Sequence, residues 1–168
     1  MSQKHPIIAV TGSSGAGTST VKDAFEHMFR RGGLRPAFVE GDSFHRYDRA
    51  DMKKAMTEAE GRGHRTFSHF GPDANLFPEL ERLFATYGES GRGQRRLYLH
   101  NEEEAAPFAG LGIGPGQFTP WEDLPEGTDL LFYEGLHGCV VTPEVDVARH
   151  VDLKIGVVPV INLEWIQK

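Results

Sequence analysis

The stretch Ile7-Ile8-Ala9-Val10-Thr11 is followed at once by Gly12-Ser13-Ser14-Gly15-Ala16-Gly17-Thr18-Ser19. A continuous apolar run of this kind is typical of a strand buried in a parallel sheet. From residue 19 to 31 the apolar residues recur at helical spacing, and Gly32-Gly33 ends the pattern. Residues 7–33 therefore predict a strand, a glycine-rich turn and a helix in direct succession.

The turn has the spacing G-x-x-x-x-G-[K]-[ST], which is the pattern of the phosphate-binding P-loop. Its glycines let backbone N–H groups surround an anion at the positive end of the following helix. The alternative is a plain Gly/Ser-rich turn before a helix. The Ser19 hydroxyl is a candidate ligand for Mg²⁺, and Thr18 stands where the pattern has lysine. We expect the nucleotide phosphates to be bound by Gly12, Ser13, Ser14, Gly15, Ala16, Gly17, Thr18, Ser19 and Thr20.

Strand and helix patterns alternate along the rest of the chain. The predicted strands are 37–40, 96–100, 129–133 and 151–158; the predicted helices are 49–60, 72–87 and 143–149. Residues 105–127 predict a long loop rich in Gly and Pro. The alternation indicates an α/β fold with a mainly parallel sheet flanked by helices. Together with the P-loop motif, it predicts a fold like that of P-loop NTPases and kinases. We expect a single domain over 1–168 that is incomplete at its C-terminal end, because the chain stops within a new helix.

Composition excludes several functional classes. The chain carries 18 Lys and Arg against 24 Asp and Glu, a formal charge of −6, which argues against a general nucleic-acid-binding protein. Its apolar runs are far shorter than the roughly 20 residues of a membrane span, and no secretory signal is recognised. The single Cys139 excludes an internal disulfide framework and a zinc site of several thiolates. These features predict a cytoplasmic enzyme.

Charged residues follow the strand predicted at 37–40. In open α/β sheets substrates bind beyond the carboxyl ends of the strands, so we expect Asp42 to face the same crevice as the P-loop. A carboxylate there can accept the proton of an attacking hydroxyl during phosphoryl transfer. His45 and Arg49 are spaced i, i+4, so one helical face can carry both toward an anionic substrate group. The alternative is a helix-capping aspartate with solvated neighbours.

Three further positions are candidates for binding. Glu134 ends the apolar strand 129–133, where P-loop enzymes place an acidic residue that helps to hold Mg²⁺; the alternative is a solvated carboxylate. His100 is a candidate contact to a phosphate or hydroxyl, although a lone histidine is more often structural. Arg31 lies with Arg30 and Arg35 at the end of the first helix, where interaction with the helix dipole and an anionic effector site are the alternatives.

Five separated segments carry a family pattern: 11–21 (TGSSGAGTSTV), 40–46 (EGDSFHR), 66–70 (TFSHF), 133–138 (YEGLHG) and 154–166 (KIGVVPVINLEWI). Together they resemble the bacterial phosphoribulokinase family over essentially the whole chain. The threonine in the lysine position of the P-loop favours this family over uridine kinase and its relatives.

The resemblance implies a kinase of the Calvin cycle, and hence of carbon fixation and photosynthesis. ATP, with Mg²⁺, would phosphorylate the C1 hydroxyl of D-ribulose 5-phosphate to give D-ribulose 1,5-bisphosphate. Asp42 matches the catalytic base of the family, and Glu134 matches the acidic residue at the metal site. The positions matched to sugar-phosphate binding are His45, Arg49, His100 and Lys168.

The resemblance also implies regulation and assembly. Arg31 matches a position linked to allosteric control, where NADH activates and AMP inhibits, and bacterial members are homo-oligomers. Two other hypotheses stay open for the chain. The first is that the chain is a nucleotide-binding module without turnover. The second is that it is another small-molecule kinase, such as uridine kinase.

Overall fold

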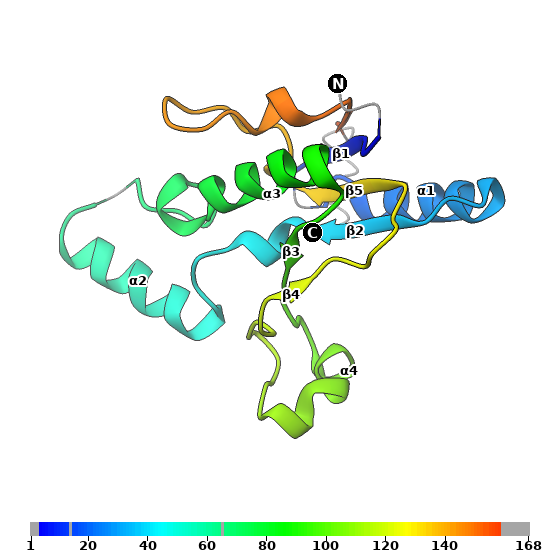
Figure 1. The fold of residues 1–168 in the computed structure, drawn as a ribbon. Coiled ribbons are helices and arrows are strands. Elements are labelled where there is room, and N and C mark those ends of the chain that lie inside the picture. The colour runs from blue at the N-terminus through cyan, green and yellow to red at the C-terminus, as the bar shows by residue number, and fades with distance from the viewer. Residues whose placement is uncertain (1–3, 14, 65, 159–168) are drawn as a thin grey trace. The chain divides into compact units, whose positions relative to one another are not determined.

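The computed structural model describes residues 4–13, 15–64 and 66–158, and the chain divides into two compact units (Figure 1). Unit 1 is formed by Met1–Gly41, Phe77–Gln94 and Asp123–Lys168. Unit 2 is formed by Asp42–Leu76 and Arg95–Glu122. The new helix predicted at the end of the chain lies outside the described residues.

Unit 1 contains a four-stranded sheet in the order β2-β5-β1-β6, and each neighbouring pair runs parallel. Its strands are β1 (Ile7–Gly12), β2 (Pro36–Glu40), β5 (Leu130–Gly135) and β6 (Leu153–Val157). The parallel sheet predicted from the alternating pattern is confirmed. Its register pairs Glu134 with Val10 on one side and with Glu40 on the other. The carboxyl ends of β1, β2 and β5 therefore lie together at one edge.

Two long helices of unit 1, α1 (Thr18–Gly32) and α3 (Phe77–Ser90), cover opposite faces of this sheet. Phe132 of β5 packs against Phe25 and Phe29 of α1, with ring centroids 5.1 and 5.6 Å apart. The next residue, Tyr133, packs against Phe84 of α3 at 5.5 Å. Successive side chains of a strand point to opposite faces, so the two helices sandwich β5 (Figure 1).

Unit 2 is built from one long helix and several short ones. Met52 of the long helix, together with Phe44 and Leu99, lies in its small buried core. The helices are α2 (Arg49–Gly61), α4 (Glu102–Ala105) and the 3₁₀ helices η1 (Gly41–Phe44), η2 (Pro72–Ala74) and η3 (Ala106–Leu111). The remaining elements of the chain are the paired strands β3 (Gln94–Arg95) and β4 (Glu122–Asp123), and η4 (Val147–His150).

Some predicted elements are wrong or shifted. The strand predicted at 96–100 is absent, because Tyr98 makes only an isolated bridge to Phe118. The helix predicted at 143–149 is replaced by a turn, in which Val141 bridges Asp146, followed by η4.

The helix predicted at 72–87 is divided, because Asn75 is extended between η2 and α3. The loop predicted at 105–127 contains η3 and β4. None of the described helices has both the length and the apolar character needed to cross a membrane.

Candidate functional site

The predicted P-loop joins β1 to α1 in unit 1. Gly15 and Gly17 have φ angles of 80° and 91°, a left-handed conformation that glycine adopts at little cost. Gly17 is the N-cap of α1 and has no side chain to offer to the N–H groups of the first turn. These N–H groups, at the positive end of the helix, suit a phosphate. Ser14, which was also predicted to bind nucleotide, lies outside the described residues.

Gly12 is required by close packing. A Cβ at this position would lie 2.9 Å from the carbonyl oxygen of Val157 and 3.0 Å from Cγ2 of Thr18. A larger residue would therefore push the turn away from β6 or displace the start of α1. The sequence spacing that predicted the P-loop thus corresponds to a tight turn with room for glycine alone at its first position.

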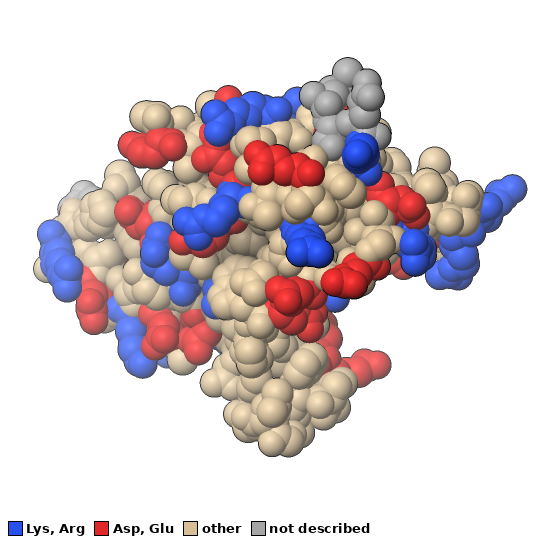
Figure 2. Space-filling view, in the orientation of Figure 1, with Lys and Arg blue, Asp and Glu red and all other residues tan. Residues whose placement is uncertain are grey.

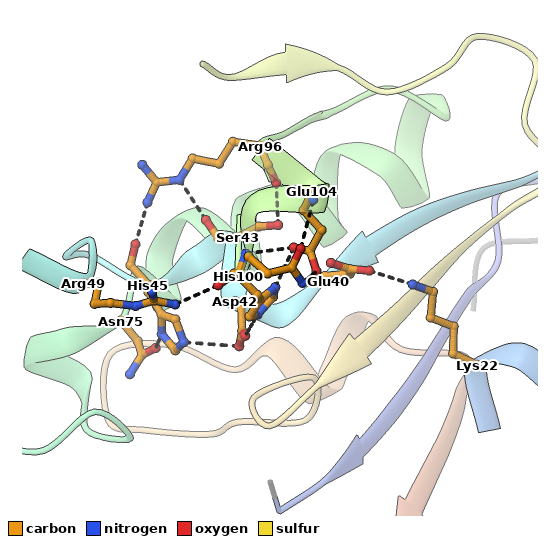
Figure 3. A network of polar contacts seen from close by, with 11 residues as sticks. Lys22, Glu40, Asp42, Ser43, His45, Arg49, Asn75, Arg96, His100 and Glu104 are labelled. Carbon is orange, nitrogen blue, oxygen red and sulfur yellow. Dashed lines mark hydrogen bonds and ion pairs between the residues drawn. The ribbon is translucent and has the colours of Figure 1, made fainter. Parts of the chain in front are cut away.

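Acidic side chains end β2 and β5 in the same unit. Nζ of Lys22, on α1, donates to Oε1 of Glu40 at 2.6 Å (Figure 3). Burial lowers the pKa of Lys22, but the hydrogen bond to Glu40 and the negative charges of Glu40, Glu26 and Glu134 together give a net rise. The ammonium group of Lys22 is therefore engaged with the carboxylates of the sheet edge.

The predicted metal ligands offer oxygen donors. Ser19 is exposed in the first turn of α1, and Glu134 lies at the end of β5. A hydroxyl and a carboxylate are ligand types that Mg²⁺ prefers, and this ion usually keeps water and substrate phosphates as its other ligands. Within the described parts of the chain, no group of three or more His, Cys, Asp or Glu side chains is arranged to hold a metal. The pair therefore fits Mg²⁺ carried by a nucleotide.

Asp42, in η1 of unit 2, is held between two imidazole rings. Its Oδ2 lies 3.0 Å from Nε2 of His100, and its Oδ1 lies 3.2 Å from Nε2 of His45 (Figure 3). The hydrogen bond with His100, followed by that with His45, holds the pKa of Asp42 far below its usual range although burial opposes this. Asp42 is consequently ionised at neutral pH, beside two of the residues predicted to bind substrate.

Glu104 supports the far side of His100. Its Oε2 accepts from the His100 backbone N–H at 2.8 Å and lies 3.0 Å from Nδ1 of the ring. Asn101 caps α4 and donates to the other carboxylate oxygen of Glu104 at 2.8 Å. The hydrogen bond with Asp42, opposed by burial and assisted by Glu104, raises the pKa of His100 to about 9. Glu104 was missed by the sequence analysis, although Asn101-x-x-Glu104 has the spacing of a capping box.

Arg49 is the first residue of α2 and contacts the group formed by Asp42, His45 and His100. Its Nη2 donates to the carbonyl oxygen of His100 at 3.0 Å. A cavity of about 500 Å³ in unit 2 is lined by Arg49, His45, Tyr98 and Lys53, among others. Lys53 follows Arg49 by one helical turn and was missed, although its i, i+4 spacing was visible in the sequence. The wall thus carries the cationic groups of Arg49 and Lys53, which suit an anionic ligand, together with the carboxylates of Asp48 and Glu60.

The two remaining predicted residues, Arg31 and Lys168, do not belong to unit 2. Arg31 is exposed at the end of α1, where Figure 2 shows Lys and Arg side chains gathered. Lys168 lies outside the described residues. The structure therefore brings together Asp42, His45, Arg49 and His100.

We expect the wild-type chain to lose about 1 kcal/mol more stability than His100→Gln between pH 6 and pH 10. The pKa of folded His100 is raised to about 9, so its stabilising contribution is complete below the unfolded value of about 6.5 and is lost as the pH rises through about 9. The side chains of His100 and Asp42 are 45% and 49% exposed, so solvent screening keeps the effect small. Urea unfolding at both pH values measures it, and equal losses in the two proteins would contradict the assignment.

Known proteins share much of this sequence and this fold. The chain is 64% identical over 168 residues to a phosphoribulokinase of Cupriavidus necator, and covers 56% of that protein. It is 58% identical over 168 residues to the phosphoribulokinase of Nitrobacter vulgaris, and covers 57% of it. The solved phosphoribulokinase from Rhodobacter spheroides superposes with a TM-score of 0.84 at 54% identity, over 98% of this chain and 55% of that one.

The chain therefore spans just over half the length of these relatives. The model of the phosphoribulokinase / uridine kinase family matches residues 7–168. With its P-loop, its parallel sheet and this match over nearly its whole length, the chain belongs to the phosphoribulokinase / uridine kinase family.

Proposed function

We propose that the chain supplies the nucleotide-binding and sugar-phosphate-binding groups of a phosphoribulokinase, which uses ATP to convert D-ribulose 5-phosphate to D-ribulose 1,5-bisphosphate. The observation that carries the proposal is the ionised Asp42, held by His100 and His45 beside a cavity with Arg49 on its wall. The identity of 64% to a phosphoribulokinase supports the choice of substrate.

Each group of the site has a role in this reaction. The C1 oxygen of the sugar forms a bond to the γ-phosphorus while the bond from that phosphorus to the β–γ bridging oxygen breaks, so ADP leaves. Asp42 takes the proton of the C1 hydroxyl. His45, Arg49, His100 and Lys53 hold the phosphate of the sugar, since charge-assisted hydrogen bonds to phosphate are strong.

The phosphates of ATP are bound by the turn 12–20 and the first N–H groups of α1. Mg²⁺, held through Ser19 and Glu134, would supply positive charge that offsets the charge of the phosphate oxygens. The ammonium group of Lys22 forms an ion pair with Glu40 and also feels the negative charge of Glu134.

The proposal extends to regulation and location. Arg31, exposed at the end of α1 among other cations, is assigned to an effector site for NADH and AMP. Lys168 is assigned to the sugar phosphate. The protein is proposed to act in the cytoplasm as a homo-oligomer, in the Calvin cycle.

The test is ADP release from MgATP with ribulose 5-phosphate, without it, and with uridine in its place. We expect release that depends on ribulose 5-phosphate. Release that depends on uridine would overturn the choice of substrate. A folded chain that binds ATP without releasing ADP under any condition would support the nucleotide-binding module instead.

A further inference from the structure

Asn75 has a buried amide whose orientation is fixed by its neighbours. The residue is 2% exposed, and its Nδ2 lies 2.8 Å from the carbonyl oxygens of both His69 and Gly71. Carbonyl oxygens only accept hydrogen bonds, so this end of the amide must be the NH₂ group. The other end, Oδ1, lies 2.8 Å from Nδ1 of His45 (Figure 3).

This arrangement determines which atoms of His45 carry protons. An amide oxygen accepts and never donates, so Nδ1 of His45 must carry a hydrogen. The Nε2 atom of the same ring faces Oδ1 of Asp42 at 3.2 Å, and an ionised carboxylate also only accepts. Both ring nitrogens therefore act as donors, which requires the imidazolium form.

The other groups around His45 do not reverse this. Burial and the charge of Arg96 lower the pKa of His45, yet the hydrogen bond and the negative charge of Asp42, with the hydrogen bond to Asn75, give a net rise. The ring of Tyr98 packs edge-on at 6.4 Å and carries no charge. The geometry and the balance of charges thus agree on a protonated ring.

His100 shows the same pattern through a different partner. Its Nδ1 faces Glu104 and its Nε2 faces Asp42, both at 3.0 Å. Each oxygen of Asp42 therefore receives one imidazolium N–H. The Nδ1 atom of His100 donates to the charged carboxylate of Glu104, whereas the Nδ1 atom of His45 donates to the neutral amide of Asn75.

We propose that Asn75 is a positioning residue, which fixes His45 as a donor at both ring nitrogens and so holds it as a cation against Asp42. This inference rests on the proposed function, in which Asp42 is the base and His45 holds the sugar phosphate. Asn75 keeps His45 positively charged, and this charge attracts both groups. Without the amide oxygen, the ring can lose its Nδ1 proton and still donate from Nε2 to Asp42. The contact with Asp42 would remain, but the positive charge would be lost.

Two variants of Asn75 separate this role from a structural one. Asn75→Leu and Asn75→Asp both lose the NH₂ group and its two bonds to the backbone. Only Asn75→Asp keeps an acceptor opposite Nδ1 of His45. The protonation midpoint of His45 should fall by about one pH unit or more in Asn75→Leu, and should stay or rise in Asn75→Asp.

Ring ¹⁵N shifts of the full chain, with His45 assigned by its loss in His45→Gln, report the protonation of each nitrogen. Thr119→Val is the matched control, because buried Thr119 accepts from the Leu97 backbone N–H at 2.8 Å. It should lose stability and leave His45 unchanged. Equal shifts of His45 in Asn75→Leu and Asn75→Asp would show a merely structural role and overturn the proposal.

The wild-type chain provides a test even where a variant fails to fold. At pH 7 both ring nitrogens of His45 should be predominantly protonated, and a ring with either nitrogen unprotonated overturns the proposal. Ribulose 5-phosphate titrated into the same samples should bind about tenfold more weakly to Asn75→Leu than to Asn75→Asp. If ribulose 5-phosphate binds equally well to the wild type, Asn75→Leu and Asn75→Asp, the inference fails and the proposed function stands. If it binds none while His45 responds as expected, the proposed function fails and the positioning role stands.

Discussion

Asp42→Asn should lower the rate of ADP formation with ribulose 5-phosphate by about 10²–10⁴-fold, the usual contribution of a general base. The amide has nearly the shape of the carboxylate but cannot take the hydroxyl proton. Its NH₂ group would also face an N–H of either His45 or His100, so one imidazole loses its acceptor. The Kd for MgATP should change little, since the residues assigned to ATP are those of the turn 12–20. A coupled assay for kcat and calorimetry for MgATP measure the two quantities.

Asp51→Asn is the control for this change. Asp51 lies on α2 of the same unit, 57% exposed, and pairs with Lys54 at 2.9 Å. An exposed pair contributes little to stability, and Asp51 does not line the cavity, so kcat should stay within about twofold. A rate for Asp42→Asn within about threefold of the wild type would refute its role as the base.

The central strands could be predicted because burial on both faces leaves a plain mark in the sequence. The first four residues of β5 are all buried, which matches the apolar run at 130–133. The false strand at 96–100 has a physical reason. Leu97 and Leu99 alternate with polar residues, and Leu99 is buried, as in a strand. Their hydrogen-bond partners, however, come from the glycine- and proline-rich segment 114–120, which pairs with this stretch through the isolated bridge Tyr98–Phe118 and forms no regular ladder.

The functional cluster could be predicted only in part. Asp42 and His45 are three residues apart, whereas His100 reaches Asp42 from 58 residues away, and sequence spacing does not show such a contact. Asn75 was not recognised, because asparagine in a turn usually caps or bends the backbone. Its role arises from the bridge that pairs His45 with Asn75, which forms only in the folded unit.

Phe132→Ala should destabilise unit 1 by about 3–5 kcal/mol, the usual cost of removing a buried aromatic side chain. Phe132 is fully buried in β5, and its ring packs against Phe25, Phe29 and Phe38, with centroids 5.1 to 5.6 Å apart. The substitution leaves a cavity between the sheet and α1, which the remaining rings cannot fill completely. The free energy of unfolding of a small domain is about 5–15 kcal/mol, so this substitution would remove a large share of the stability. Urea unfolding followed by circular dichroism measures the change.

Met28→Ala tests whether burial, and not apolar content, accounts for this loss. Met28 lies on the same helix that contacts Phe132, but it is 61% exposed, so its removal should change stability by less than about 0.5 kcal/mol. If the two variants lose similar amounts, α1 does not pack on β5 as described. A large loss in Phe132→Ala alone would show that the aromatic cluster fixes α1 on the sheet. The first turn of α1 carries the proposed phosphate site, so the cluster would then also hold that site beside the end of β5 and Glu134.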